Sequence, residues 1–521
     1  MADDTRPARP WLRPTLIALA AVGLVAHALV FDFVNDDAFI SFRYADNLVR
    51  HGELVFNPGE RVEGYTNFLW TVLMAGVLAL GLDVVAWSKA LGIVFAVGTL
   101  GVLARFTARH VGERSAWDAL APALLAAAPA YACWSTGGLE TQQFTFFATL
   151  GWATYLGERQ AADEGGSRGW PLSGVWFALS ALARPEGLLF FGLTGLHRLV
   201  ELIAVERTIR PSRADWLWGV GFALVFAPYQ AWRWWYYGWP FPNTYYVKTG
   251  AKSFWVPGWR YFASWVVAHG LWVVPALAVL RRGLPGRREG RLLSLGVLYV
   301  VAMSLHVIRV GGDFMALHRF LVPLMPVVAV LAALGLRVVV ERLRLAGHGM
   351  GRVAVGAVLA AVLFGVQVAR VDRAALAVGS EGGVDSIGWL AMFADQTAAI
   401  GKYLAANAPP DASIATTAAG IIPFYSRLHT LDVLGLNDEW IAHNVPARGN
   451  RPGHTKSAPL EYVLGKEVDY LIYHPTISER RPEKGAGEKR SWQQRGYRWE
   501  AVEVPGMSPP WWGYWRRVEG E

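Results

Sequence analysis

The sequence predicts a polytopic α-helical membrane protein that carries a smaller extracytoplasmic α/β domain at its C-terminal end. Three observations lead to this class. The 521 residues are 53% hydrophobic and only 17% charged, an apolar excess typical of multispanning proteins. Runs of about 20 apolar residues, each long enough to cross a bilayer, recur through residues 1–371. Residues 372–521 contain no such run, so we expect a membrane domain followed by a soluble domain.

Most of the apolar runs predict one membrane-spanning helix each. The run at 172–204 is too long for one crossing and is interrupted by Arg184-Pro185-Glu186, which predicts a hairpin of two helices. The run at 66–82 is barely long enough, and we expect it to re-enter the membrane rather than cross. The other runs lie near 14–33, 86–106, 117–134, 140–157, 215–237, 259–280, 292–308, 318–341 and 352–371.

Arginine-rich loops alternate with loops that carry acidic and amide residues. Under the positive-inside rule, the basic loops all become cytoplasmic when the chain makes about eleven crossings, which leaves the C-terminal domain outside. These loops lie at Arg6–Arg13, Arg105–Arg114, Arg198–Arg213, Arg281–Arg291 and Arg337–Arg352. The opposite face then collects five polar segments, which suggests one cavity: Asp36-Asp37, Glu140, Arg184–Glu186, Asn243–Lys248 and Asp313–Arg319.

Composition also argues against several classes of protein. The net charge of +8 comes from arginines placed between apolar runs, which indicates a membrane topology signal rather than nucleic-acid binding. The single Cys133 excludes an intramolecular disulfide and a cysteine-based zinc site. Residues 12–33 are too long for the apolar part of a signal peptide, so we expect an uncleaved first span. No glycine-rich nucleotide-binding fingerprint is present.

In the soluble domain, strand and helix patterns alternate, as expected for a small α/β fold. Two stretches read as strands, Ser413–Thr417 and Tyr470–Tyr473, and two as helices, Ala398–Asn407 and Pro459–Lys466. The charged, glycine-containing tract Ser478–Lys489 predicts a mobile loop.

The stretch Val34–Trp70 holds paired acids where the first span should leave the membrane. Asn35 or Asp36 is a candidate N-cap, and apolar residues then recur at helical spacing, which predicts a short amphipathic helix on the membrane surface. Asp36 and Asp37 would sit in its first turn. Such acids either stabilise the helix dipole or take part in catalysis at the water–lipid boundary. The pair alone leaves both interpretations open.

The acid pair, together with the motifs downstream, resembles the GT-C glycosyltransferases, and most of all the terminal arabinofuranosyltransferases of actinobacterial cell walls. The first of these motifs are Asn57-Pro58-Gly59-Glu60 and Glu63-Gly64-Tyr65-Thr66-Asn67. The resemblance extends to Pro242–Lys248, Gly311–Arg319 and, more weakly, Arg451-Pro452-Gly453-His454-Thr455-Lys456.

This resemblance implies an inverting enzyme of the bacterial cytoplasmic membrane that uses a polyprenyl-phosphate sugar, with arabinofuranose as the expected sugar. The acceptor would be an extracytoplasmic glycan, lipid or protein, and no nucleic acid is involved. Within the superfamily, a mannosyl-type transferase or one acting on lipid A or pilin remains open. From a different class, a transporter or flippase also remains open, although no internal repeat of the kind found in transporters is visible.

The resemblance assigns roles to individual residues. Asp36 is the leading candidate for the base and Asp37 its partner, or the reverse. A divalent cation is left open, and this pair is its only candidate site. The donor phosphate is expected to meet Arg319, His318, Lys248 and Arg43, although snorkelling to the interface is an equal alternative for Arg319 and Lys248. The expected sugar- and acceptor-binding residues are Asp313, Glu140, Asn243, Arg184, Glu186, His454 and Lys456.

Overall fold

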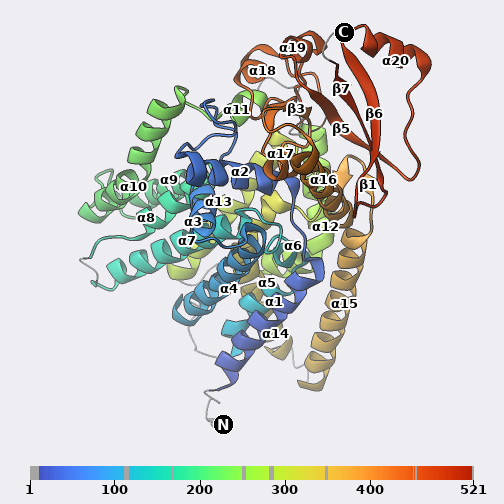
Figure 1. The fold of residues 1–521 in the computed structure, drawn as a ribbon. Coiled ribbons are helices and arrows are strands. Elements are labelled where there is room, and N and C mark those ends of the chain that lie inside the picture. Colours follow the sequence, from blue (N-terminus) through green and yellow to red (C-terminus); the bar gives the residue numbers. More distant parts are fainter. Residues whose placement is uncertain are drawn as a thin grey trace. The chain divides into compact units, whose positions relative to one another are not determined.

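A computed structural model describes residues 11–110, 116–166, 169–248, 254–280, 287–345, 350–449, 451 and 454–518 (Figure 1). Packing divides the chain into two compact units. The first comprises residues 1–32, 89–229 and 255–377, and the second comprises residues 33–88, 230–254 and 378–521. Several residues that entered the sequence-based interpretation lie outside the described residues: Arg6, Arg9, Arg114, Arg281, Arg282, Pro452 and Gly453.

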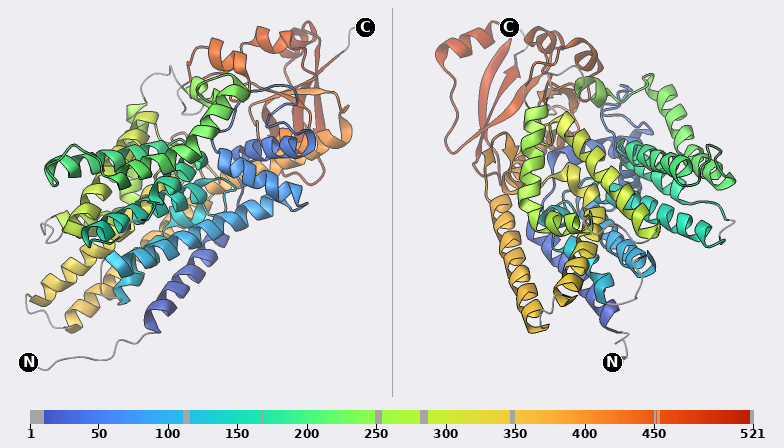
Figure 2. Two further views of the ribbon diagram at one scale, coloured as in Figure 1. Left: turned by 90° about the vertical axis from the view of Figure 1, so that its left-hand side faces the viewer. Right: turned by 180° about the vertical axis from the view of Figure 1, so that it is seen from behind.

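The first unit is helical. Its long helices run alongside one another (Figure 2), with α12 packed against α13 and α14, and α7 packed against α8. The helices are α1 (Leu12–Phe31), α4 (Val84–His110), η1 (Ala116–Ala119), α5 (Leu120–Ala126), α6 (Pro129–Cys133), α7 (Thr141–Asp163), α8 (Ser173–Ala183), α9 (Gly187–Ala204), α10 (Arg213–Tyr237), α12 (Trp255–Leu280), α13 (Arg287–Val310), η2 (Arg319–Leu324), α14 (Met325–Leu345) and α15 (Met350–Leu376).

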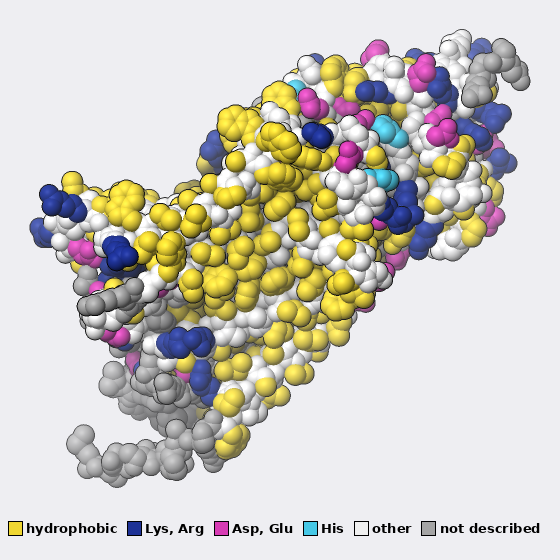
Figure 3. All heavy atoms as spheres, turned by 60° about the vertical axis from the view of Figure 1, so that its left-hand side comes forward, with side chains coloured by type: hydrophobic (Ala, Val, Ile, Leu, Met, Phe, Trp, Pro, Cys, Tyr) yellow, Lys and Arg dark blue, Asp and Glu magenta, His cyan; other side chains and the backbone are white. Residues whose placement is uncertain are grey.

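Length and hydropathy identify six candidate membrane spans among the described residues. These are Leu12–Phe31, Val84–Arg109, Gly187–Ala204, Arg288–Val310, Arg319–Leu343 and Ala354–Leu376. In the last of them, 0% of the apolar window is buried inside the protein. Figure 3 shows apolar side chains covering much of the visible helical surface. An apolar surface of this extent fits contact with lipid rather than water.

Two predicted interruptions of the helical pattern can be compared with the structure. The hairpin at 172–204 is confirmed, because α8 ends at Ala183 and α9 begins at Gly187. The single span expected over 117–134 is wrong, because this stretch forms η1, α5 and α6. Pro129 occupies the start of α6 and has no N–H to continue a preceding helix, so the chain breaks there.

The predicted re-entrant run at 66–82 forms α3 (Phe68–Ala79), which has 12 residues. At 1.5 Å per residue this helix is about 18 Å long, shorter than the hydrocarbon core of about 30 Å. The helix packs against α2 (Asp36–His51) in the second unit.

The second unit contains a five-stranded sheet in the order β4-β3-β5-β7-β6. Strands β4, β3 and β5 are parallel, and β7 and β6 continue the sheet antiparallel. The strands are β3 (Ser413–Thr416), β4 (His429–Asp432), β5 (Tyr470–Ser478), β6 (Tyr497–Glu503) and β7 (Trp511–Arg517), with a separate hairpin of β1 (Ser380–Glu381) and β2 (Val384–Asp385).

Helices cover both faces of this sheet. Successive residues of β3 point to opposite faces, so Ile414 joins the core under α16 and α17, and Ala415 joins the core under α18 and α19. The helices of the second unit are α2, α3, α11 (Asn243–Lys248), α16 (Ile387–Asn407), α17 (Ile421–Ser426), α18 (Glu439–Asn444), α19 (Leu460–Gly465) and α20 (Ala486–Gln493).

The predicted strands and helices of the C-terminal domain are confirmed by β3, β5, α16 and α19. The mobile loop expected over Ser478–Lys489 is wrong at both ends. Ser478 belongs to β5, and residues from Ala486 onward form α20. Ala486, Glu488 and Lys489 are good helix formers, and their propensity outweighs the glycine and charge pattern that favoured a loop.

Candidate active site

The helix α2 begins as the sequence predicts. Asn35 is the N-cap, and its side-chain oxygen accepts a hydrogen bond of 2.8 Å from the backbone N–H of Asp37. Asp36 and Asp37 occupy the first turn, and Gly52 ends the helix in the left-handed region at φ 71°. Local capping chemistry therefore places the two carboxylates where we expected them.

The surroundings of α2 differ from the expected membrane surface. All residues from Ala38 to Ala45 are buried in the second unit. The ring of Phe39 lies 5.3 Å from that of Phe424 in α17, and the ring of Phe42 lies 6.2 Å from it. With α3 and α17 both in contact with α2, the apolar side chains that predicted a lipid-facing surface pack against protein instead.

The carboxylate of Asp36 is held by backbone amides of the C-terminal domain. Oδ1 accepts from the N–H of Ile421 at 2.7 Å, and Oδ2 accepts from the N–H of Gly420 at 3.2 Å. Burial raises the pKa of Asp36 to about 7, helped by the nearby charges of Asp37 and Asp432 and opposed by the two hydrogen bonds. A carboxylate with a pKa near neutrality is matched to accepting a proton from a hydroxyl group.

Asp432, at the end of β4, was not singled out by the sequence analysis. Its side chain is fully buried and accepts hydrogen bonds from the backbone N–H groups of Leu434 and Asn437, at 3.0 and 2.9 Å. Burial raises its pKa to about 6. Asn437 also accepts a hydrogen bond from the hydroxyl of Tyr44 in α2, at 3.1 Å. The bonds to Leu434 and Asn437 are local, whereas the contact with Tyr44 joins residues 393 positions apart and could not be read from the local sequence.

Arg43 has a structural role. Its guanidinium donates to the carbonyl oxygens of Phe56 and Leu428, at 2.6 and 2.8 Å, to that of Pro423, and to the side-chain oxygen of Asn57 at 3.0 Å. The side chain is buried, and all these acceptors belong to the protein. We therefore leave Arg43 out of the proposed donor site.

The motifs that follow α2 are also used to hold the second unit together. The side chain of Asn57 exchanges two hydrogen bonds with the backbone of Thr430, donating at 3.0 Å and accepting at 3.1 Å, like one more residue of a strand beside β4. Glu63 forms a buried ion pair with Arg233, at 2.7 Å. Sequence analysis did not identify Arg233, which lies within an apolar run and has its partner 170 positions away.

The segments around Asn243 and Lys456 also pack within the second unit. The Asn243 side chain donates to the carbonyl oxygens of Gly435 and Leu436, at 2.9 and 3.0 Å, so it anchors a loop of the C-terminal domain. Lys456 donates to the carbonyl oxygen of Ala442 at 2.6 Å, and burial lowers its pKa. His454 forms an isolated bridge with Arg451. Asn243, like Arg43, is thus explained by packing.

Five of the predicted residues come together in the first unit. Arg184 pairs with Glu140 and with Glu186, the latter at 2.8 Å, and Arg319 pairs with Asp313 at 2.8 Å. Both guanidinium groups lie over one aromatic ring, Phe320, at 5.4 and 5.2 Å from its centroid, so the two ion groups are neighbours.

The electrostatics of this ion cluster favour polar rather than strongly anionic ligands. Burial opposes ionisation of Glu186, but attraction and hydrogen bonding to Arg184 outweigh it and lower the pKa to about 2. Three carboxylates then face two guanidinium groups. Such a set suits hydroxyl groups of a sugar, and a phosphate would have to compete with Asp313 for Arg319.

The remaining two phosphate candidates are His318, which is partly buried, and Lys248, which is exposed. The ring nitrogen Nε2 of His318 lies 2.8 Å from the hydroxyl of Ser264, and the ring meets Tyr261 edge-on at 5.1 Å. His318 adopts φ 51°, and earlier in the same loop Gly311 and Gly312 have φ values of 93° and 75°. These two glycines supply the turn that the sequence predicts before Asp313. Lys248 is exposed at the last position of α11.

The donor set does not fit a metal ion. Among the described residues, no group of three or more histidine, cysteine, aspartate or glutamate side chains is arranged to hold one. The only candidate site for a divalent cation that the sequence analysis named is the pair Asp36 and Asp37. The amides of Gly420 and Ile421 each occupy one acceptor site on the Asp36 carboxylate, and no step is derived through a metal.

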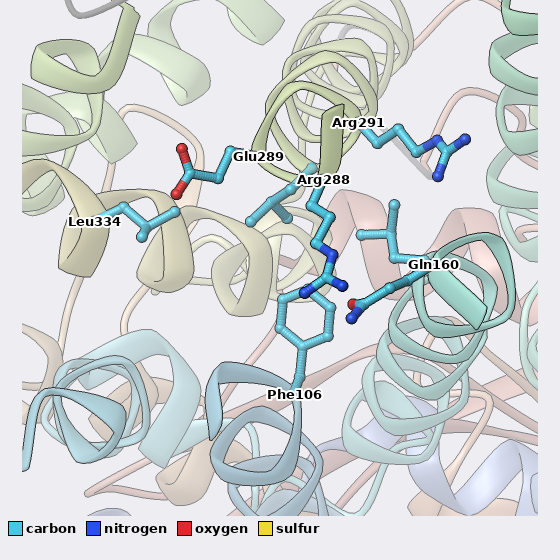
Figure 4. Close-up of a pocket in the computed structure, with 8 residues that line it drawn as sticks. Phe106, Gln160, Arg288, Glu289, Arg291 and Leu334 are labelled. Atoms are coloured by element: carbon cyan, nitrogen blue, oxygen red, sulfur yellow. The ribbon is translucent and has the colours of Figure 1, made fainter. Parts of the chain in front are cut away.

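A small cavity lies elsewhere in the first unit, between α4, α7, α13 and α14 (Figure 4). Its charged lining comes from Arg288, Glu289 and Arg291, at the start of α13. Arg291 is paired with Asp163 and Glu201. The residues that line the cavity belong to the first unit, whereas Asp36 belongs to the second, so we do not associate this cavity with the candidate base.

Comparison with known proteins connects the chain to glycosyltransferases. Residues 384–514 match a family described as a domain of unknown function, DUF8728. A terminal β-(1→2)-arabinofuranosyltransferase of Corynebacterium glutamicum is 28% identical over 376 residues, covering 62% of this chain and 52% of that protein. Its namesake in Mycobacterium tuberculosis is 28% identical over 325 residues, with coverages of 56% and 51%. The chain spans about half the length of the curated relatives it matches.

Solved structures share the fold. ArnT from Cupriavidus metallidurans, crystallised with undecaprenyl phosphate, aligns with a TM-score of 0.60 at 13% identity over 99% of this chain and 100% of that chain. The oligosaccharyltransferase of Archaeoglobus fulgidus in its apo form aligns with a TM-score of 0.60 at 12% identity, over 89% of this chain and 69% of that one. The chain therefore shares the fold of these two transferases, and the curated relatives that it resembles are named as glycosyltransferases.

Proposed function

We propose that the chain is an integral-membrane glycosyltransferase that moves a sugar from a polyprenyl-phosphate donor to an extracytoplasmic acceptor. The observation that carries the proposal is the placement of Asp36, a carboxylate at the start of α2 that is oriented by the backbone N–H groups of Gly420 and Ile421. The names of the relatives and the undecaprenyl phosphate bound to ArnT support the donor class.

The finer assignments follow from the resemblance and the predicted topology. The sugar is arabinofuranose, transferred to a glycan, lipid or protein outside the cytoplasmic membrane of a bacterium. The chain crosses that membrane several times, with residues 1–371 as the membrane domain and residues 372–521 as an extracytoplasmic domain. The relatives' shared name, terminal β-(1→2)-arabinofuranosyltransferase, supports this sugar over the mannosyl-type alternative.

In the proposed reaction, Asp36 removes the proton from an acceptor hydroxyl. The oxygen attacks the anomeric carbon, the bond from that carbon to the phosphate oxygen breaks, and polyprenyl phosphate leaves with inversion at the anomeric carbon. Asp37 assists the base. Arg319, His318 and Lys248 are kept as candidates for the phosphate, and the sugar- and acceptor-binding candidates are Asp313, Glu140, Arg184, Glu186, His454 and Lys456.

The test is transfer of radiolabelled sugar from a polyprenyl-phosphate donor by the full-length protein in lipid vesicles. Asp36→Asn keeps the shape of the side chain and removes the base, so kcat should fall about 10²- to 10⁴-fold. Asp46→Asn on the same helix is the matched control. Asp46 pairs with Arg50 at 2.7 Å, and its substitution should leave kcat within about twofold.

Two results would argue against this assignment. Near-normal transfer by both Asp36→Asn and Asp37→Asn would reduce the acid pair to a structural role at the start of α2. Loss of transfer in the Asp46→Asn control as well would show that the helix tolerates no change of charge and that the effect is not specific to the base.

A further inference from the structure

The C-terminal sheet domain reaches the candidate base through one loop. Strand β3 lies between β4 and β5 in the parallel part of the sheet, and it ends at Thr416. The carboxyl end of parallel strands is the edge where α/β sheets usually place their functional loops. Four residues beyond that end, Gly420 and Ile421 direct their N–H groups at Asp36.

Gly420 is needed for the closeness of this contact rather than for its backbone angles. Its φ is −98°, a value open to any residue. A Cβ atom at position 420 would lie 1.8 Å from the backbone oxygen of Asp36 and 3.0 Å from its carboxyl carbon. The first of these distances is impossible without moving the backbone of α2 or of the loop. Only glycine therefore lets the two amides approach the carboxylate.

Other contacts fix the same helix to the same domain. Arg43, about two turns beyond the acid pair, donates to the carbonyl oxygens of Pro423 and Leu428. The hydroxyl of Tyr44 in α2 also donates to the side-chain oxygen of Asn437, at 3.1 Å. The helix is thus anchored on several sides, so a displacement at Gly420 cannot be absorbed by a simple rotation of α2.

We propose that Gly420 is a positioning residue for the transfer reaction: through its N–H and that of Ile421, the C-terminal domain holds the Asp36 carboxylate in its reactive orientation. This inference rests on the proposed function. Each carboxylate oxygen accepts one backbone N–H and keeps a lone pair for the acceptor hydroxyl. Backbone amides keep one protonation state and one direction, so they fix the base without competing for its proton.

The consequence for the base has a definite sign. Hydrogen bonds to the ionised form favour that form, so the two amides hold the pKa of Asp36 below the value that burial alone would set. Moving them away should raise the pKa and misplace the carboxylate. Substitution of Gly420 should therefore lower kcat and shift the pH dependence of kcat to higher pH, whereas binding of the lipid-linked donor should stay unchanged.

The experiment uses the full-length protein in lipid vesicles with a polyprenyl-phosphate sugar donor. Gly420→Ala should lower kcat about 10²-fold, the loss expected from a misplacement of about 1 Å, with KM for the donor within about twofold of wild type. The midpoint of the rise of kcat with pH should also move upward. Gly465→Ala in α19 is the matched control, because no atom lies within 4 Å of the added Cβ there. It should behave as wild type.

A second variant guards against misfolding. Ile421→Pro removes the shorter of the two N–H donors and puts a ring carbon in place of the hydrogen that faces Asp36 Oδ1. It should shift the pH profile in the same direction. Ile422→Val is the control for lost packing in this helix, since it trims a buried side chain and keeps every backbone donor. Thermal unfolding of each purified variant shows which of them are folded.

A double mutant separates positioning from general damage. If Gly420 acts through Asp36, Gly420→Ala should cause no further loss of kcat in the Asp36→Asn background. Multiplying effects, an unchanged pH midpoint in both loop variants, or wild-type kcat in Gly420→Ala would overturn the inference and leave the proposed function standing. Absence of any transfer by the wild-type protein would overturn the proposed function and this inference together.

Discussion

Asp36 and Asp37 are neighbours in the chain, yet their surroundings differ. The Asp36 carboxylate reaches the amides of Gly420 and Ile421, whereas the backbone N–H of Asp37 is the group that Asn35 caps. The hydrogen bonds to the Asp36 carboxylate support Asp36 as the base and Asp37 as its partner, in the order that the resemblance favours.

The pH dependence of transfer follows from this assignment. The pKa of Asp36 lies at about 7, above its ordinary value of 3.8, and a base acts only when it is deprotonated. We expect kcat to rise about tenfold per pH unit below pH 7 and to level off above it, measured with saturating donor and acceptor. A kcat that is constant from pH 5 to 8 would contradict Asp36 as the base.

At the scale of the element, α2 is a helix whose apolar residues are buried by protein on more than one side. Arg43 makes this possible, because its fork satisfies carbonyl oxygens from the 53–60 loop and from the C-terminal domain at once. Burial lowers the pKa of Arg43 to about 10, which leaves it charged at neutral pH. A planar fork with several donors suits this arrangement better than a lysine ammonium.

The structural role of Arg43 makes a prediction about stability. Arg43→Lys should lower the unfolding temperature markedly, since each buried carbonyl left without a donor costs about 1–3 kcal/mol. Arg50→Ala on the same helix is the control, because an exposed pair such as Arg50 and Asp46 contributes at most about 1 kcal/mol. Differential scanning fluorimetry on the purified proteins measures both. If Arg43→Lys keeps its stability but loses affinity for polyprenyl phosphate, Arg43 returns to the donor site.

At the scale of the whole molecule, the chain forms two compact units, and neither of them is one continuous stretch of sequence. Residues 33–88 and 230–254 pack with the C-terminal part, whereas the helices on either side of them in the chain form the other unit. The loops between predicted spans are therefore part of the same body as the sheet. A C-terminal part that holds the proposed base fits this arrangement.

The predicted topology can be tested with reporter fusions. Arginine-rich loops should stay in the cytoplasm, so a fusion after Arg282 should report inside and a fusion after Arg373, at the end of α15, should report outside. Alkaline phosphatase and a fluorescent protein serve as the paired reporters. Two fusions on the same side would remove the argument that the polar segments share one face of the membrane.

The sequence by itself determined the features that depend on neighbouring residues. The start of α2 at Asn35, the hairpin around Pro185 and the strand at Ser413 each follow from caps, a proline or apolar periodicity within a few positions. These signals act within one turn or one strand, so they survive without knowledge of the fold. Pro129 is also a local signal for a helix break, but the length of the apolar run at 117–134 led us to expect a single span there.

Only the tertiary structure decided which partners those elements meet. Arg43 binds Pro423 across 380 positions, Asp36 meets Ile421 across 385, and Asn243 meets Gly435 across 192. In the sequence, an arginine that binds phosphate looks the same as one that donates to buried carbonyl oxygens. Only the atoms packed around the guanidinium distinguish the two roles. Gly420 shows the same limit, because the need for a missing side chain exists only where two distant backbones touch.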